Sequence, residues 1–203
     1  MRLSLLIVCV LMACAGSPRP IAMPYSAQLS PEASRPVVLE RAIDPSLEAL
    51  GLPSLAGVAL PTGYRELRLS RGPGMILGEE YPVIRVLESP AGVRGEIIRC
   101  RSFSDTSTRT IRWTARRVRP ARAVDWTRLL AGLDQLNVNG FEAPVYRTAI
   151  TDAGDLVVEI RRGAEYRAYE VNAPQLREDS VSQRAAMIAA VVDSLGRLTR
   201  GYD

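Results

Sequence analysis

The 203-residue chain contains neither histidine nor lysine, so arginine supplies all 26 of its basic side chains. Without histidine, the chain cannot form a Ser-His-Asp or Cys-His catalytic group, or a zinc site with a histidine ligand. Without lysine, it cannot form a Schiff base or supply the phosphate-binding lysine of a P-loop. We attribute the all-arginine set to GC-rich codon usage. No catalytic residue, cofactor or metal site is expected from this sequence.

Cysteine is also scarce and occurs only as Cys9, Cys14 and Cys100. The first two belong to the N-terminal region, where Arg2 precedes an apolar run from Leu3 to Met12. A run of about ten residues is too short to span a bilayer, which takes about 20, but it suits the core of a signal peptide.

The end of this run, Leu11-Met12-Ala13-Cys14, resembles the lipobox of bacterial lipoproteins: Leu, a small or apolar residue, Gly or Ala, then Cys. The resemblance covers only the first fourteen residues. It implies cleavage before Cys14, lipid on the Cys14 sulfur and a lipid-anchored protein of the cell envelope. Ala15 after the cysteine implies the outer membrane, on its periplasmic side, in a diderm cell. An ordinary secretory signal cleaved after Ala15 is the alternative, because Ala13 and Ala15 fit the small-x-small rule.

The rest of the chain divides by composition into three parts. Residues 14–36 are rich in proline, which favours extended backbone, so we expect a semi-stiff tether after the 1–13 signal. Residues 37–63 form an irregular segment, in which residues 45–50 could make a short helix closed by Gly51. Residues 64–203 are expected to form one domain.

That domain is predicted to be α+β, with an antiparallel meander sheet of about seven strands in two groups. One helix separates the groups, and a long C-terminal helix packs on the sheet. The elements are predicted at Tyr64–Ser70, Tyr81–Glu88, Arg94–Phe103 and Thr108–Arg117 for the first strands, and at Trp126–Leu136 and Ser180–Leu198 for the helices. Asp125 caps the first helix, Asn139-Gly140 ends it, and Ser180 with Gln183 forms a capping box for the second.

The second strand group is predicted to be a three-stranded meander. A type II′ turn at Gly163-Ala164 would place Arg161 opposite Tyr166, where a cation–π contact could form. The same turn would pair Ile160 with Arg167, Val158 with Tyr169 and Leu156 with Val171. A second turn, at residues 152–154, would place Ile150 opposite Leu156.

An arginine-rich stretch from Arg94 to Arg122 is the first candidate site. Its alternation predicts one wet strand face, with Ile111 on the other, apolar face. Guanidinium groups bind phosphates and carboxylates through paired hydrogen bonds, so the stretch could bind an anion. The anion-binding candidates are Arg99, Arg101, Arg112 and Arg116. The simpler interpretation is a solvated strand face. Nucleic acid is not expected, because only 5 % of residues are aromatic and the expected location is outside the cytoplasm.

Three further groups of residues have simpler structural roles than catalysis or ligand binding. An aromatic set could line a groove but is expected to serve packing: Trp113, Tyr146, Tyr166 and Tyr169. Two acidic pairs lie in turn-like sequence, which favours local hydrogen bonds over catalysis: Asp152 with Asp155, and Glu79 with Glu80. Cys100 is expected to be a small buried hydrophobe on the same strand face as Ile98.

The sequence therefore favours a non-enzymatic binding or accessory module of the envelope. Its expected partners are the membrane, through lipid on Cys14, and an anionic envelope component or a partner protein. The rival hypothesis is a membrane-tethered hydrolase that uses carboxylates, with tyrosine or arginine assisting. A convergent acid and base would separate the two, and none is evident in the sequence.

Overall fold

The structure, a computed structural model, describes residues 27–28, 36, 39–72, 80–105, 107–108, 110–140 and 154–199. Cys14, its signal and most of the expected tether lie outside these residues. Within them, no helix is both long enough and apolar enough to cross a membrane.

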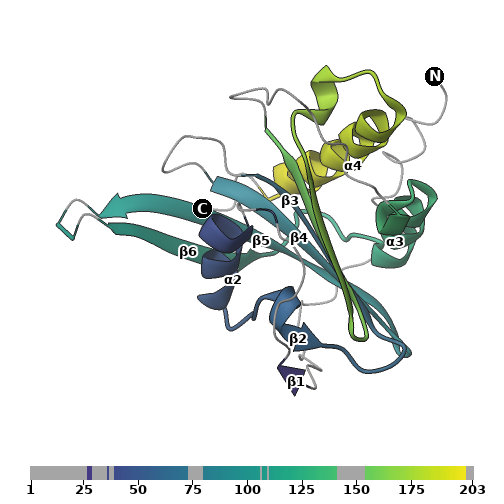
Figure 1. Cartoon of the computed structure of the whole chain (residues 1–203), viewed down its shortest axis with the longest axis horizontal. Coiled ribbons are helices and arrows are strands. Elements are labelled where there is room, and N and C mark those ends of the chain that lie inside the picture. Colours follow the sequence, from purple (N-terminus) through teal and green to yellow (C-terminus); the bar gives the residue numbers. More distant parts are fainter. Residues whose placement is uncertain are drawn as a thin grey trace.

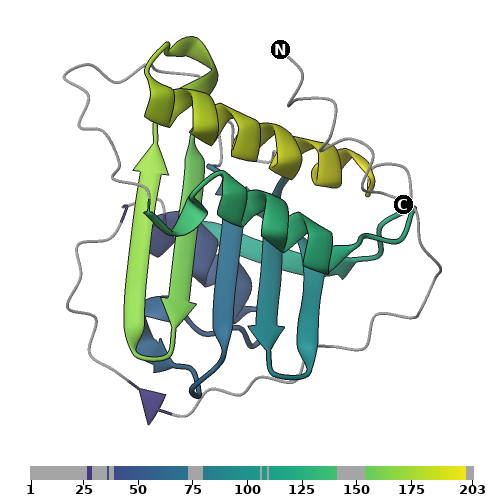
Figure 2. The same cartoon turned by 90° about the vertical axis from the view of Figure 1, so that its right-hand side faces the viewer.

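The fold is α+β, as predicted, and is built on a six-stranded antiparallel sheet of order β6-β5-β4-β3-β7-β8 (Figures 1 and 2). The strands are β3 (Arg65–Arg71), β4 (Glu80–Ser89), β5 (Gly92–Asp105), β6 (Thr110–Val118), β7 (Leu156–Arg162) and β8 (Glu165–Val171). A separate pair joins β1 (Ala27–Gln28) to β2 (Val58–Ala59).

The two predicted strand groups are halves of this one sheet, because β3 pairs with β7 as well as with β4. Leu156 therefore lies opposite Arg71 on one side and Val171 on the other. The predicted pairing of Ile150 with Leu156 is wrong, since β3 already occupies that edge of β7; residues 141–153 lie outside the described part. The β7–β8 register itself is confirmed, and Gly163, with φ +57°, begins its turn.

Helices α3 (Trp126–Gln135) and α4 (Ser180–Arg197) cover one face of the sheet (Figure 2). The predicted cap of α3 is confirmed, because the Asp125 side chain accepts a hydrogen bond from the Arg128 backbone N–H. Their leucine, isoleucine and valine side chains form the main core with Leu67, Ile84 and Val158. Each such buried side chain contributes about 1.5–3 kcal/mol through removal from water.

Two predicted helix ends are shifted. The cap of α4 is Asp179, one residue before the predicted Ser180; its carboxylate accepts from the Ser182 backbone N–H. An aspartate accepts this bond more strongly than a serine, which explains the choice. Helix α3 ends at Gln135. Asn137, whose φ is +58°, follows it, and Val138–Gly140 then forms the short helix η3. The left-handed residue is thus not in the predicted Asn139-Gly140 pair.

The opposite face of the sheet is covered by the segment from Leu39 to Leu60, which forms a second layer. It contains the π-helical turn η1 (Leu39–Ile43), the predicted short helix α2 (Asp44–Glu48) and the turn η2 (Leu55–Gly57). A smaller core joins this layer to β4 and β5; its members include Leu39, Ile43, Leu47, Tyr81, Val83, Ile98 and Cys100. The remaining short helix, η4 (Pro174–Leu176), links β8 to α4.

The β5–β6 hairpin extends beyond the rest of the sheet (Figure 1). Pairing of β4 with β5 ends at Glu80 and Arg101. Starting from that last pair, residues 101–105 of β5 pair with residues 110–114 of β6, and residues 102–105 have no partner on β4. We call these two runs the arm. Ile111, expected on a covered face, is 51 % exposed, because no described element packs over the end of the arm.

Candidate functional site

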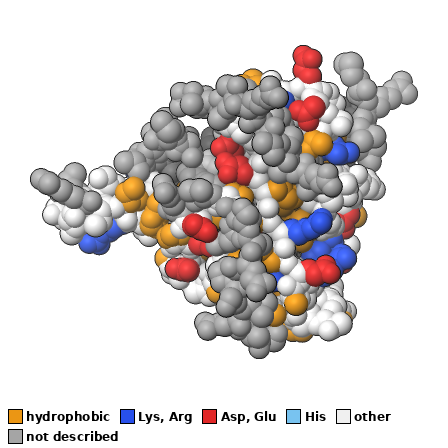
Figure 3. All heavy atoms as spheres, in the orientation of Figure 1, with side chains coloured by type: hydrophobic (Ala, Val, Ile, Leu, Met, Phe, Trp, Pro, Cys, Tyr) orange, Lys and Arg blue, Asp and Glu red, His pale blue; other side chains and the backbone are white. Residues whose placement is uncertain are grey.

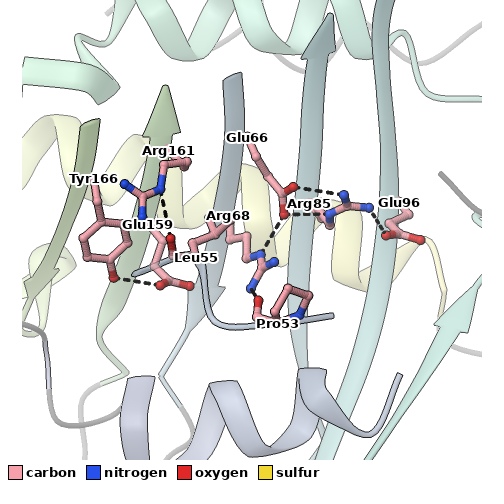
Figure 4. A network of polar contacts seen from close by, with 9 residues as sticks. All are labelled: Pro53, Leu55, Glu66, Arg68, Arg85, Glu96, Glu159, Arg161 and Tyr166. Carbon is pink, nitrogen blue, oxygen red and sulfur yellow. Dashed lines mark hydrogen bonds and ion pairs between the residues drawn. The ribbon is translucent and has the colours of Figure 1, made fainter. Parts of the chain in front are cut away.

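A row of buried charged side chains crosses the face of the sheet that carries α2 (Figure 4). It runs through five neighbouring strands, and we call it the charge belt. Its members are Glu96 on β5, Arg85 on β4, Glu66 and Arg68 on β3, Glu159 and Arg161 on β7, and Tyr166 on β8. Arg68 lies directly opposite both Arg85 and Glu159, so the belt follows the register of the sheet.

Glu66 is the centre of the belt and is fully buried. Its Oε1 accepts hydrogen bonds from Arg85 Nε at 2.7 Å and Arg68 Nε at 2.8 Å, and its Oε2 accepts from Arg85 Nη2 at 3.0 Å. Burial alone would raise the pKa of Glu66, but Arg68 and Arg85 outweigh it, so this pKa is lowered. Arg85 also donates to Glu96 at 2.6 Å. The carboxylate of Glu66 is thus held ionised between two guanidinium groups.

The other end of the belt holds the second layer onto the sheet. Arg68 donates to the carbonyl of Pro53 at 2.9 Å, and Arg161 donates to those of Leu55 at 3.0 Å and Ala56 at 2.8 Å. The predicted contact of Arg161 with Tyr166 is confirmed, with 5.3 Å from its guanidinium carbon to the ring centroid. These three carbonyl groups belong to an irregular segment and take part in no strand pairing, so the arginines supply their hydrogen-bond donors. The belt therefore has a structural role.

Sequence reasoning missed the belt, because Glu66 and Arg68 alternate with leucines and so look like the wet face of a strand. Opposite charges at facing positions, such as Arg85 with Glu96, were the available signal. Using it across β3 and β7 required a pairing that the sequence did not reveal.

One of the four predicted anion-binding residues, Arg99, is not available to a ligand. It is 4 % exposed and lies against the C-terminal end of α4. There it donates to the Thr199 hydroxyl at 2.9 Å and to the Gly196 carbonyl. A cation at this end of a helix is favourable because the last carbonyls carry partial negative charge. Arg99 therefore caps α4, a long-range contact that strand alternation could not predict.

The structure does bring the other three together, on one face of the β5–β6 hairpin. Arg101 lies opposite Thr114, so Arg112 and Arg116 are its diagonal neighbours on β6. Arg112 Nε lies 2.8 Å from Asp105 Oδ2, and Arg116 Nη2 lies 3.5 Å from Glu80 Oε1. The side chains of Arg112 and Arg116 remain 59 % and 47 % exposed, so these ion pairs contribute little to stability.

The arm also carries exposed apolar side chains (Figure 3). Phe103 is 38 % and Ile111 is 51 % exposed, and they lie on opposite faces of the arm near its tip. Beside them, β6 forms one edge of the sheet, and no described strand pairs with its outer side. From Thr110 to Val124 the sequence contains arginines but no acidic residue. The arm therefore combines cationic, apolar and unpaired backbone groups.

The aromatic set does not form a groove. Tyr166 and Tyr169 lie on opposite faces of β8. The hydroxyl of Tyr166 donates to Glu159 at 2.8 Å in the charge belt, whereas that of Tyr169 donates to the Val138 carbonyl at 2.9 Å in the helix-side core. Packing and local hydrogen bonds account for both, and Tyr146 lies outside the described residues.

Neither acidic pair can be compared as a pair, because Asp152 and Glu79 lie outside the described part. Asp155 is paired instead with Glu170, whose pKa is raised to about 7, first by burial and then by the Asp155 carboxyl group. Asp155 itself accepts hydrogen bonds from the Asn172 side chain at 2.8 Å and the Ala173 backbone N–H at 3.2 Å. Local bonding of this kind was the expected role of Asp155.

Cys100 is fully buried beside Tyr81, as predicted for a small hydrophobe. Burial raises the pKa of its thiol to about 12. The described residues contain no group of three or more cysteine, aspartate or glutamate side chains placed to hold a metal ion.

Comparison with protein-family models and with curated proteins finds no match for this chain. The candidate site therefore rests on the geometry alone. The charged side chains of the charge belt are buried and hold the second layer onto the sheet, so they have a structural role. The arm is exposed, and it is therefore the candidate functional surface.

Proposed function

We propose that this chain is a lipid-anchored protein of the bacterial cell envelope that works as a non-enzymatic binding module, with the arm as its contact surface. The observation that carries the proposal is the arm itself. It projects past β4, and it exposes Phe103 and Ile111 next to Arg101 and Arg112. A two-stranded ribbon on its own adds little stability, so these exposed groups are better explained by contact with a partner.

The N-terminal motif supports the location. Lipid on Cys14 would hold the domain at a membrane, since each buried CH₂ contributes about 0.8 kcal/mol. The proline-rich residues 14–36 would keep the domain, and with it the arm, away from the anchor.

The charge belt does not favour the hydrolase alternative. Glu66 and Glu96 are bonded to arginines, and Glu159 accepts from Tyr166. A glycosidase-type mechanism needs an acid and a base that flank a substrate, and these carboxylates instead lie within the protein interior.

The anchor is tested by mass spectrometry of the mature N-terminus from cells that make the full chain or its Cys14→Ser variant. We expect a lipidated Cys14 in the membrane fraction, and an unlipidated, released Cys14→Ser chain. A mature wild-type chain that begins at Gly16 without lipid would show that the anchor is wrong.

The contact surface is tested separately by a photo-crosslinking amino acid at position 111 in living cells. Position 176 is the matched control, because Leu176 is 60 % exposed but lies in η4, away from the arm. We expect a discrete adduct from position 111 and none from position 176. Equal labelling at both positions would contradict a role for the arm.

A further inference from the structure

The outer side of β6 is an edge of the sheet whose backbone groups no described strand satisfies. Its nine residues, Thr110–Val118, are long enough to pair with another strand, and most of their side chains are exposed. Exposed edges of this length bind extended peptides by adding a strand, in which main-chain hydrogen bonds give affinity and alternate side chains give specificity.

The side chains of β6 indicate which kind of strand could pair with its outer edge. One face presents Arg112 and Arg116. The other presents Ile111 and Trp113, followed by Ala115, which packs against the smaller core, and by Arg117, which is paired with Glu96. The two acids that pair with these arginines in the described residues, Asp105 and Glu80, lie on the inner strands β5 and β4, not on the outer side of β6. Facing residues of opposite charge, and facing apolar residues, stabilise antiparallel pairs.

We propose that β6 binds an extended segment of a partner protein in which acidic residues alternate with apolar ones. This inference rests on the proposed binding function and names the partner chemistry for the same surface. Pairing of β6 with a second copy of itself is less favourable, because it would bring the arginines of two strands together. An anionic lipid surface would be drawn to the arginines but would leave the strand edge unpaired.

The test uses the purified full chain and a fluorescently labelled nine-residue peptide that alternates glutamate with valine. Its controls are a peptide of the same composition with the glutamates grouped together, and two peptides N-methylated on alternate backbone nitrogens. We expect the alternating peptide to bind and to slow hydrogen exchange of the β6 amides. Only one of the two N-methylated peptides should bind, because an added strand bonds through one edge.

Charge reversal provides the protein-side test. The Arg112→Glu, Arg116→Glu double variant should bind the alternating peptide at least about tenfold more weakly. It should also gain binding to the same peptide with arginine in place of glutamate. The matched control reverses two exposed arginines outside the hairpin edge, Arg94→Glu with Arg128→Glu, and should bind as the wild type does. Thermal unfolding confirms that both double variants are folded.

Four outcomes would overturn the inference. These are no binding of the alternating peptide, equal binding of the grouped peptide, no change in exchange of the β6 amides, or binding of vesicles with anionic lipid in place of the peptide. The crosslink at position 111 and the lipid on Cys14 are measured independently of peptide binding. The inference of an acidic partner strand can therefore be wrong while the proposed function remains supported.

Discussion

The indole ring of Trp126 lies directly against Gly95 on the helix-covered face of β5, where a β-carbon on Gly95 would lie 2.2 Å from Trp126 Cε3. The absence of a side chain at position 95 therefore lets the first residue of α3 contact the sheet. We expect Gly95→Ala to displace the ring or the strand and to lower the free energy of unfolding by about 1–3 kcal/mol. Urea unfolding measures this change.

The control for this substitution is Gly132→Ala in α3. No atom lies within 4 Å of a β-carbon built at that position. Replacing a helical glycine by alanine there should raise the free energy of unfolding by about 0.5–1 kcal/mol. If both variants changed stability in the same direction, the close approach of Trp126 to Gly95 would not explain the effect.

The charge belt predicts that Glu66→Gln is strongly destabilising. It leaves Arg68 and Arg85 buried without their shared carboxylate, and breaking a buried ion pair from one side costs about 3–5 kcal/mol. The matched control is Glu88→Gln, because Glu88 also pairs with an arginine, Arg65, but is 41 % exposed. That variant should lose less than about 1 kcal/mol in the same urea experiment. Equal losses would contradict the central place of Glu66.

Glu170 predicts a pH dependence of stability. Folding raises its pKa from the ordinary 4.5 to about 7, so the folded chain keeps a proton that the unfolded chain has lost. Its contribution to stability is therefore full below about pH 4.5 and declines as pH rises to about 7. Glu170→Gln should remove this decline, while Glu165→Gln, at an exposed position of the same strand, should keep it. Parallel curves for the wild type and Glu170→Gln would contradict the prediction.

Cys100 should be unreactive in the folded protein, because burial both shields its thiol and keeps it protonated. We expect a chain with Cys9 and Cys14 replaced by serine to react with a thiol reagent at pH 8 only after urea is added. Adding Thr127→Cys, at an exposed position of α3, supplies a thiol that should react at once. Fast labelling of Cys100 without urea would show that the layer from Leu39 to Leu60 opens readily.

Local signals allowed much of the fold to be predicted. The Gly163-Ala164 turn determined the whole β7–β8 register, and Asp125 with the leucine spacing identified α3. Contacts between distant parts of the chain could not be predicted in this way. The pairing of β3 with β7, and the bonds of Arg161 to the carbonyls of Leu55 and Ala56, join segments far apart in sequence.

The candidate site was predicted in part for the same reason. Arg101, Arg112 and Arg116 fall on one face because they belong to one hairpin, whose alternation is visible in the sequence. Arg99 has the same alternation, yet it is buried because α4, which comes near the end of the chain, packs over it. Likewise, the alternation places Ile111 on the apolar face of its strand. It is nevertheless exposed, because β4 ends before the arm and the arm extends past the rest of the sheet.

The central place of β3 has a consequence for the order in which the chain folds. The β3–β4, β4–β5, β5–β6 and β7–β8 hairpins each close a short loop, but the β3–β7 contact joins residues from the two halves of the chain. Closing a long loop has a larger entropic cost, so the hairpins should form first and β3 should meet β7 last. A growing chain that ends before β7 would therefore leave one edge of β3 unpaired, and the protein should reach its final packing only when synthesis is nearly complete.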